Sequence, residues 1–241
     1  MSSQEILSQV RTSVIEPFLE ILYPHCCILC EHKLQHHETR ICARCWDSFP
    51  RLLNDHDAYA DLREKFHSAG FVNDCLTVFL FEKEGGIQRV IHLLKYSGYT
   101  TLGFKLGEEI GKKILGESNF LDAQMLIPVP LHKLKLRERG YNQSECICRG
   151  ISSVTKIPVR ANILVRSRYT TTQTELDISE RIDNVSGAFQ VREKSRDYIT
   201  WKKIILVDDV ITTGSTINSC ASELLKYGAN NVLSASVAHA Y

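Results

Sequence analysis

The sequence lacks a charge imbalance, a long hydrophobic run and a leader-like N-terminus. Its 29 Lys and Arg residues face 28 Asp and Glu residues, so the formal net charge is only +1. No run approaches the roughly 18 apolar residues that span a bilayer. The first residues contain no apolar segment preceded by positive charge, as a signal peptide would. Bulk charge therefore gives no reason to expect a polyanionic partner, and we expect an unexported protein without membrane insertion.

Internal repeats and low-complexity segments are also absent. A hydrophobic fraction of 44% and a charged fraction of 24% are typical of a globular chain, and they exclude an intrinsically disordered or fibrous one. A length of 241 residues leaves room for one sizeable domain and a small appendage. We expect an N-terminal helix and cysteine-rich segment at residues 1–55, followed by a main domain at residues 56–241.

Cysteine is the residue type that stands out, with nine copies. In an unexported chain such a number indicates metal ligands or buried thiols in a reducing, cytoplasmic setting. Two C-x-x-C pairs, separated by 11 residues, can supply the four thiolates of a closed, structural zinc site. The alternatives are buried thiols, or a ligand from one of the histidines 25, 32, 36 and 37. The predicted zinc ligands are Cys27, Cys30, Cys42 and Cys45, and the predicted packing residues are Cys75, Cys146, Cys148 and Cys220.

Strand and helix patterns alternate from residue 71 onward, after an amphipathic helical pattern at 3–22 that contains Pro17 and a helical stretch at 51–67. Such alternation is typical of an α/β fold with a mainly parallel sheet. The expected strands cover residues 76–81, 125–129, 163–165, 204–207 and 232–237. The expected helices cover residues 87–94, 101–115, 143–155 and 215–227.

The segment at residues 204–216, IILVDDVITTGST, carries the most specific pattern. An apolar run typical of a strand buried on both faces ends in Asp208 and Asp209. A turn rich in Thr, Gly and Ser then opens a helix, whose first amide groups attract anions. The pattern predicts a monophosphate cradle made by Thr212, Thr213, Gly214, Ser215 and Thr216.

The two carboxylates suit a sugar better than a phosphate. They can accept hydrogen bonds from sugar hydroxyls, or orient waters on a divalent cation. The loop is not a Walker A motif, because no G-x-x-x-x-G-K-[ST] pattern is present. An ordinary strand-to-helix turn is the plain alternative, but such a turn has no need of two consecutive carboxylates.

Two further segments have the chemistry of a pyrophosphate site. Lys95, Tyr96, Ser97 and Gly98 follow an apolar helix, and a turn there could hold pyrophosphate through backbone amides and the Lys95 ammonium. The alternative is a helix C-terminus in which Lys95 complements the dipole and Gly98 caps. Arg137 and Arg139 stand before a glycine, so both could project from a loop onto pyrophosphate oxygens. Their alternative is a solvated basic turn.

Residues 131–170 contain nine Lys or Arg and only two acidic residues. The balanced net charge thus hides a local excess of seven positive charges. Two tyrosines in the same stretch could stack on bases. Either a polyanion-binding surface or the lining of a diphosphate pocket would explain this excess. The candidate contacts are Lys133, Lys135, Arg137, Arg139, Tyr141, Arg166 and Arg168.

The segment IILVDDVITTGST resembles the phosphoribosyl-pyrophosphate (PRPP) motif of type I phosphoribosyltransferases. The segments LLKYSGY (93–99) and RERGYNQS (137–144), and the double C-x-x-C, narrow the resemblance to the ComF family of competence proteins. So does a spaced set at Thr171, Gln173, Leu176, Arg181, Asn184 and Phe189. The resemblance runs from about residue 23 to residue 241. It implies that Asp208 and Asp209 contact the ribose hydroxyls and that residues 212–216 contact the 5′-phosphate.

The resemblance further implies a type I phosphoribosyltransferase fold, PRPP bound with Mg²⁺, and the handling of incoming single-stranded DNA during natural transformation. The alternative is an active phosphoribosyltransferase that moves ribose 5-phosphate from PRPP to an unidentified nitrogenous acceptor, so catalysis stays open. A third hypothesis makes the N-terminal segment a docking module for a DNA-uptake helicase or another competence protein, which would also place the chain near a membrane through its partners.

Overall fold

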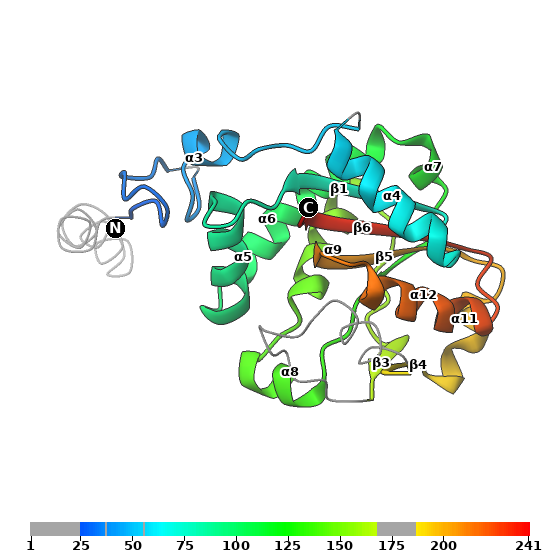
Figure 1. Cartoon of the computed structure of the whole chain (residues 1–241). Coiled ribbons are helices and arrows are strands. Elements are labelled where there is room, and N and C mark those ends of the chain that lie inside the picture. Colours follow the sequence, from blue (N-terminus) through cyan, green and yellow to red (C-terminus); the bar gives the residue numbers. More distant parts are fainter. Residues whose placement is uncertain (1–24, 37, 55, 168–186) are drawn as a thin grey trace, which may run out of the picture. The chain divides into compact units, whose positions relative to one another are not determined.

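The structure is a computed structural model that describes residues 25–36, 38–54, 56–167 and 187–241. The chain divides into two compact units, Met1–Phe49 and Pro50–Tyr241 (Figure 1). The amphipathic helix expected at residues 3–22 therefore lies outside the described residues. No helix in the described ranges is long and apolar enough to cross a membrane.

The described part of the first unit contains one short helix, α3 (Ala43–Asp47), and a backbone bridge between Cys26 and Lys33. Its apolar interior is small, although Trp46 and Phe49 meet edge to face with ring centroids 5.5 Å apart. The buried apolar or thiol side chains of its described part are Cys27, Ile41, Cys42, Trp46 and Phe49. So few buried side chains supply little of the hydrophobic stabilisation that a fold needs.

A four-stranded parallel sheet forms the centre of the second unit, in the order β1-β6-β5-β2. Ile205 lies at the middle of the sheet, opposite Leu126 on one side and Leu233 on the other. The α/β class and the mainly parallel sheet expected from the sequence are thereby confirmed. The strands are β1 (Asp74–Leu80), β2 (Met125–Pro128), β5 (Lys203–Ile211) and β6 (Asn231–His239).

Helices cover both faces of this sheet, as Figure 1 shows. Ile204 and Leu206 belong to a buried cluster that includes side chains of α4 and α12. Ile205 and Val207 point to the other face, because side chains alternate along a strand, and they too have no exposed surface. The longer helices are α4 (Asp57–Ala69), α5 (Gly86–Tyr96), α6 (Thr100–Leu115), α9 (Gln143–Thr155) and α12 (Ser215–Lys226).

Glycines allow α6 and α9 to cross at very short range. A Cβ atom built on Gly150 would lie 1.9 Å from the carbonyl oxygen of Phe104, and one on Gly107 would lie 2.1 Å from that of Ile147. Both neighbours are backbone atoms, which cannot move aside without displacing a helix. The two glycines therefore fix the distance between the helices that carry parts of the candidate site.

Several short elements were not expected from the sequence. They are α7 (Ser118–Leu121), α8 (Lys133–Arg139), β4 (Phe189–Val191), the 3-10 turn η2 (Glu193–Ser195) and α11 (Arg196–Ile199). β4 pairs antiparallel with β3 (Leu164–Arg166) in a separate two-stranded sheet. The expected helix at 51–67 is partly wrong. α4 begins only at Asp57, and Arg51 makes a backbone bridge to Phe79 instead.

Candidate phosphate and metal sites

β5 carries both aspartates to the carboxyl edge of the sheet. The sequence placed the end of this strand at Val207, but the strand continues to Ile211 because β6 pairs with it as far as His239. Asp208 and Asp209 thus lie inside a paired strand, where their backbone is held by neighbours. Alternation along the strand sends the two carboxylates to opposite faces of the sheet.

The turn after β5 has the conformation that an anion cradle needs. Gly214 has a φ of +75° and caps the N-terminus of α12. A Cβ atom there would also lie 3.0 Å from Cε1 of Phe66 in α4. Glycine is therefore required for its backbone conformation and for the close approach of α4. The first amide groups of α12 have no partner within the helix and point toward the turn.

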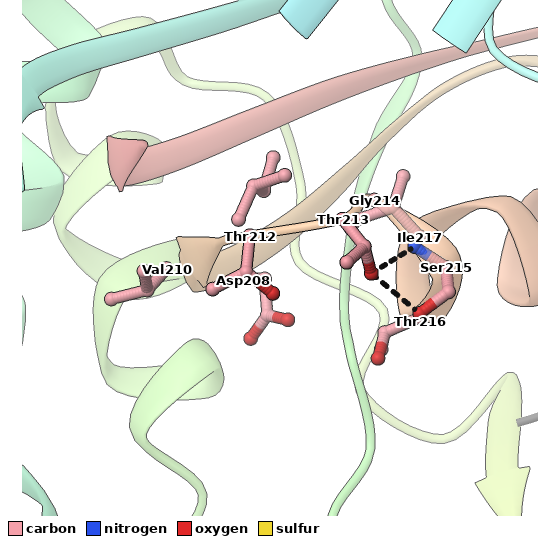
Figure 2. Close-up of a pocket in the computed structure, with 9 residues that line it drawn as sticks. Asp208, Val210, Thr212, Thr213, Gly214, Ser215, Thr216 and Ile217 are labelled. Carbon is pink, nitrogen blue, oxygen red and sulfur yellow. Dashed lines mark hydrogen bonds between the residues drawn. The ribbon is translucent and has the colours of Figure 1, made fainter. Parts of the chain in front are cut away.

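A small pocket lies at this turn, and it is lined by Asp208 and by residues 210–217 (Figure 2). The hydroxyl groups of Thr213 and Ser215 are 3.0 Å apart, and the Ser215 amide donates to the Thr213 hydroxyl at 3.4 Å. The structure brings the predicted phosphate residues together around one hollow, which they line together with Val210 and Ile211. They are Thr212, Thr213, Gly214, Ser215 and Thr216.

Asp208 is held by donors from two elements. The Ser144 hydroxyl at the start of α9 lies 3.1 Å from Oδ1 of Asp208, and the Asp209 amide donates to the same oxygen at 2.9 Å. Burial, followed by the neighbouring negative charge of Asp209, raises the pKa of Asp208 to about 7. The site therefore contains a carboxyl group that titrates near neutral pH. Ser144 was missed as a site residue because its partner lies far away in the sequence.

Asp209 is paired with Lys95. The Lys95 ammonium lies 2.8 Å from Oδ2 of Asp209, whose side chain is only 6% exposed. Burial alone would lower the pKa of Lys95, but the Asp209 and Asp208 carboxylates raise it above its ordinary value. The sequence placed Lys95 beside the pyrophosphate and did not link it to Asp209, 114 residues away.

The segment Lys95 to Gly98 is the end of a helix. Lys95 and Tyr96 belong to the last turn of α5, and the Ser97 amide caps that helix by donating to the Leu93 carbonyl at 3.0 Å. Gly98 follows with a left-handed φ of +75°. The Ser97 amide is therefore occupied, and Lys95 is the group of this segment whose charge faces the carboxylates.

Arg137 and Arg139 lie on a helix, so their expected placement in a loop is wrong. α8 is capped by His132, whose ring accepts from the Leu134 amide, and by Gly140 at a φ of +80°. Residues two apart on a helix do not share a face. Accordingly Arg139 donates to Gln143 and lies over the Tyr96 ring at 5.4 Å, whereas Arg137 is exposed.

Four cationic side chains lie near one another at the carboxyl edge of the sheet. They are Lys95, Lys135, Arg139 and Arg166. Burial lowers the pKa of Lys135, and the charges of Arg166, Arg139 and Lys95 lower it further. Burial also lowers the pKa of Arg166, which feels the opposing attraction of Asp208. The edge therefore presents a positive surface beside two carboxylates.

The other DNA-binding candidates differ in placement. Lys133 is exposed on α8, while the hydroxyl of Tyr141 donates to the Leu94 carbonyl and so ties the segment after α8 to α5. Arg168 lies outside the described residues, as do five of the spaced residues that supported the family resemblance. Those five are Thr171, Gln173, Leu176, Arg181 and Asn184.

The four cysteines of the paired motifs form a cluster in the first unit. The sulfur atoms of Cys27, Cys30, Cys42 and Cys45 all lie within 4.8 Å of one another. The Cys30 and Cys42 sulfurs are 3.7 Å apart, close to the separation of about 3.8 Å that tetrahedral Zn–S bonds of about 2.3 Å impose. The cluster could therefore hold a metal ion.

Backbone donors favour a thiolate at Cys27. Burial would raise the pKa of Cys27, but amide donors, including that of Cys42 at 3.4 Å, lower it to about 6. The pKa of Cys42 and that of Cys45 are raised instead, the latter chiefly by burial. Burial raises the pKa of Cys75, Cys146, Cys148 and Cys220, which are packed in the second unit as expected.

No protein-family model matches the chain. Competence protein F of Haemophilus influenzae is 36% identical over 109 residues, which cover 45% of this chain and 47% of that protein. DNA utilization protein YhgH of Escherichia coli O157:H7 is 30% identical over 146 residues, or 59% of this chain and 63% of the relative. Competence protein ComFC of Bacillus subtilis is 32% identical over 105 residues, which cover 43% of this chain and 39% of that protein. The chain is a homologue of these competence and DNA-utilization proteins. The alignments span roughly two fifths to two thirds of the relatives' lengths.

Solved structures that match include a glutamine PRPP amidotransferase from B. subtilis complexed with ADP and GMP. It is 21% identical with a TM-score of 0.37, and the match covers 55% of this chain and 26% of that one. A hypoxanthine-guanine phosphoribosyltransferase from L. donovani is 14% identical with a TM-score of 0.35, and the match covers 57% of this chain and 71% of that one. A hypothetical protein from Neisseria gonorrhoeae with bound ppGpp is 14% identical with a TM-score of 0.38, covering 58% and 68%.

Proposed function

We propose that the carboxyl edge of the sheet binds PRPP with Mg²⁺, and that the chain handles incoming single-stranded DNA during natural transformation. The observation that carries the PRPP part is the strand, turn and helix at residues 203–226. There two adjacent aspartates lie near the end of a buried strand, and Asp208 lines one pocket together with the glycine-capped turn that follows. The DNA part is supported by the relatives named for competence and DNA utilization.

Each part of PRPP has a matching group. The first amides of α12 and the turn hydroxyls suit the 5′-phosphate, and the carboxylates of Asp208 and Asp209 suit the ribose hydroxyls. The pyrophosphate would meet the ammonium of Lys95 and the guanidinium of Arg139, which both lie at this edge. Charge-assisted hydrogen bonds of this kind favour an anionic ligand.

The same carboxylates fit Mg²⁺, which prefers hard oxygen ligands. Asp208 and Asp209 are adjacent negative charges, and the described ion pairs provide a cation only for Asp209. A divalent cation would neutralise the remaining charge at Asp208, which lines the pocket and is the carboxylate best placed to hold it. When bound, Mg²⁺ would also screen the charge of the pyrophosphate.

Thermal denaturation tests the PRPP part. Millimolar PRPP with Mg²⁺ should raise the melting temperature of the α/β unit by about 5–10 °C, as expected for a ligand at some hundredfold above its Kd. Asp208→Asn combined with Asp209→Asn should abolish this rise. Glu64→Gln, which removes an exposed carboxylate of α4, is the matched control and should keep it. A wild-type protein that does not respond to PRPP refutes this part.

The question of catalysis has its own measurement. In phosphoribosyl transfer, a nitrogen nucleophile attacks C1′ while the bond from C1′ to the pyrophosphate oxygen breaks and pyrophosphate departs. Release of pyrophosphate that depends on both PRPP and a nitrogenous acceptor would establish the transferase alternative. Lys95→Met should then lower the rate through lost stabilisation of the leaving group.

Binding of a labelled 20-nucleotide oligo(dT) tests the DNA part. We expect affinity to fall steeply as salt rises, because phosphate contacts release counterions. Lys133→Glu with Arg137→Glu reverses two exposed charges on α8 and should weaken binding. No binding at low salt refutes the DNA part and leaves the PRPP part standing.

We also propose that the cysteine cluster of the first unit holds a structural Zn²⁺. Four thiolates close a tetrahedral shell and leave no position for a reactive water. The spacing of the sulfur atoms and the amide donor to Cys27 support this assignment. Elemental analysis should find one zinc per chain.

A further inference from the structure

The turn between α11 and β5 presents an unusual tryptophan. Trp201 is 80% exposed, the largest exposed fraction among the large hydrophobic side chains of the described part. Its φ is +60°, in the left-handed region that bulky residues avoid. Trp201 occupies the position after the cap of α11, where glycine is the usual residue. Trp201 therefore combines an unfavourable left-handed backbone conformation with an unfavourably exposed indole.

The backbone of this turn is firmly held. The Trp201 amide donates to the Gly228 carbonyl at 2.8 Å, and the Lys202 amide donates to the Ile199 carbonyl at 3.0 Å. The indole is thus displayed from an anchored position and is not on a loose loop. Tyr198, on α11, is 64% exposed and lies three residues earlier.

Positive side chains accompany the two rings. Residues 192–202 contain four cations and two acids. None of the four forms an ion pair with another residue of the described ranges, whereas the acid Glu193 already accepts a hydrogen bond from the Tyr227 hydroxyl at 3.3 Å. The four cations are Arg192, Lys194, Arg196 and Lys202.

We propose that the segment at residues 192–202, here called the Trp201 patch after its exposed Trp201, Tyr198 and these four cations, binds single-stranded polynucleotide. Exposed aromatic rings stack on unpaired bases, and neighbouring cations contact the phosphates. Stacking of this kind tolerates any base, so the patch should bind without sequence preference. A cationic rim also argues against a purely apolar protein contact. The proposal rests on the DNA part of the proposed function and adds a surface to it.

The Trp201 patch is separate from the candidate PRPP site. It precedes the amino end of β5, whereas the phosphate turn follows the carboxyl end of the same nine-residue strand. At about 3.3 Å per residue, the two lie roughly 30 Å apart. It also lies outside the basic stretch at 131–170. Changes in the patch should therefore leave PRPP binding intact.

The chain contains two tryptophans, Trp46 and Trp201. Because Trp46 is 6% exposed, Trp46→Phe leaves the exposed indole as the only tryptophan reporter. We expect oligo(dT) to quench its fluorescence at the same concentrations that raise the anisotropy of the labelled strand. Anisotropy without quenching would place the strand elsewhere and overturn the proposal.

Trp201→Gly separates a binding role from a structural one. Glycine relieves the left-handed strain, so the melting temperature should rise, while the affinity for oligo(dT) should fall roughly fivefold to hundredfold. Trp201→Phe should lose less affinity, and Leu121→Ala, at another exposed apolar residue, should lose none. PRPP should still raise the melting temperature of Trp201→Gly.

The remaining outcomes are distinct. Unchanged oligo(dT) affinity in Trp201→Gly, together with weaker binding in the α8 charge reversals, overturns the patch and keeps the DNA part. Self-association that Trp201→Gly abolishes while the DNA affinity stays constant also overturns it, in favour of a protein interface. Absence of any oligo(dT) binding by the wild-type chain refutes both.

Discussion

The two units of the chain use cysteine in opposite ways. In the first unit four thiols converge to within 4.8 Å, and few apolar side chains are buried among its described residues, 25–36 and 38–49. In the second unit each thiol, as at Cys148 and Cys220, is one packing residue among many, and burial raises its pKa. The small unit thus brings four thiols together beside few buried apolar side chains. In the large unit, the hydrophobic core positions the elements that carry Asp208 and Asp209.

This difference implies different sources of stability. A unit with a small core needs a metal or another cross-link to stay folded. A sheet covered by helices on both faces has a surplus of buried apolar area, which can support a site that opposes folding. Asp208, with its raised pKa, belongs to such a site.

Loss of a thiol from the cluster should have the largest effect. Cys42→Ser removes one of the four proposed ligands, so the metal content should fall from one per chain to nearly none. Residues 25–49 should then exchange their amide hydrogens freely, because binding of the metal supplies the folding energy of such a unit. Hydrogen exchange and elemental analysis measure both changes. The unfolding transition of the α/β unit should stay where it is.

Cys26→Ser is the matched control. Cys26 is adjacent to the proposed ligand Cys27 but lies outside the cluster, and its replacement should leave the metal in place. Retention of a full metal equivalent by Cys42→Ser would show that the thiols are not the ligands, and the contrast between the units would disappear.

A methyl group at the crossing of α6 and α9 should have the next largest effect. Gly150→Ala places a Cβ atom against backbone of the facing helix, and overpacking of this kind costs about 3 kcal/mol. Denaturant unfolding of the α/β unit measures the loss. The metal content should be unchanged, because the substitution lies in the second unit and the cysteine cluster lies in the first.

Gly116→Ala, at the C-terminal cap of α6, provides the comparison. A Cβ atom there would lie 3.4 Å from the Lys113 carbonyl oxygen, in ordinary contact, so the free energy of unfolding should change by less than about 0.5 kcal/mol. Equal effects of the two substitutions would contradict the close crossing.

Local signals predicted much of the fold. α9 was predicted with its exact bounds because Asn142 caps it, accepting from the Ser144 amide at 3.0 Å, and its apolar residues have helical spacing. The β5 to α12 segment was predicted from its apolar run and its Gly214 turn. Both signals involve residues that are close in the sequence.

The misses have physical reasons. α8 buries none of its residues, so no apolar stripe marks it, and only its caps at His132 and Gly140 could have revealed it. The contacts of Lys95 with Asp209 and of Ser144 with Asp208 join segments far apart in the chain. The exposure and left-handed backbone of Trp201 follow from the end of α11, which the sequence did not predict.

Removal of the Asp208 charge should change the free energy of unfolding in the opposite direction. With a native pKa of about 7 and an ordinary value of 3.8, the folded state holds a proton between these limits that the unfolded state has released. The free energy of unfolding should therefore fall as pH rises from 4 to 7, by at most about 1.4 kcal/mol per pH unit.

Asp208→Asn should flatten this fall and be more stable than wild type at pH 8. Urea unfolding at several pH values, without added Mg²⁺, measures the difference, with Glu64→Gln as the control. A steeper or equal fall in Asp208→Asn would show that this carboxyl does not oppose folding, and that the site of the large unit needs no support from its core.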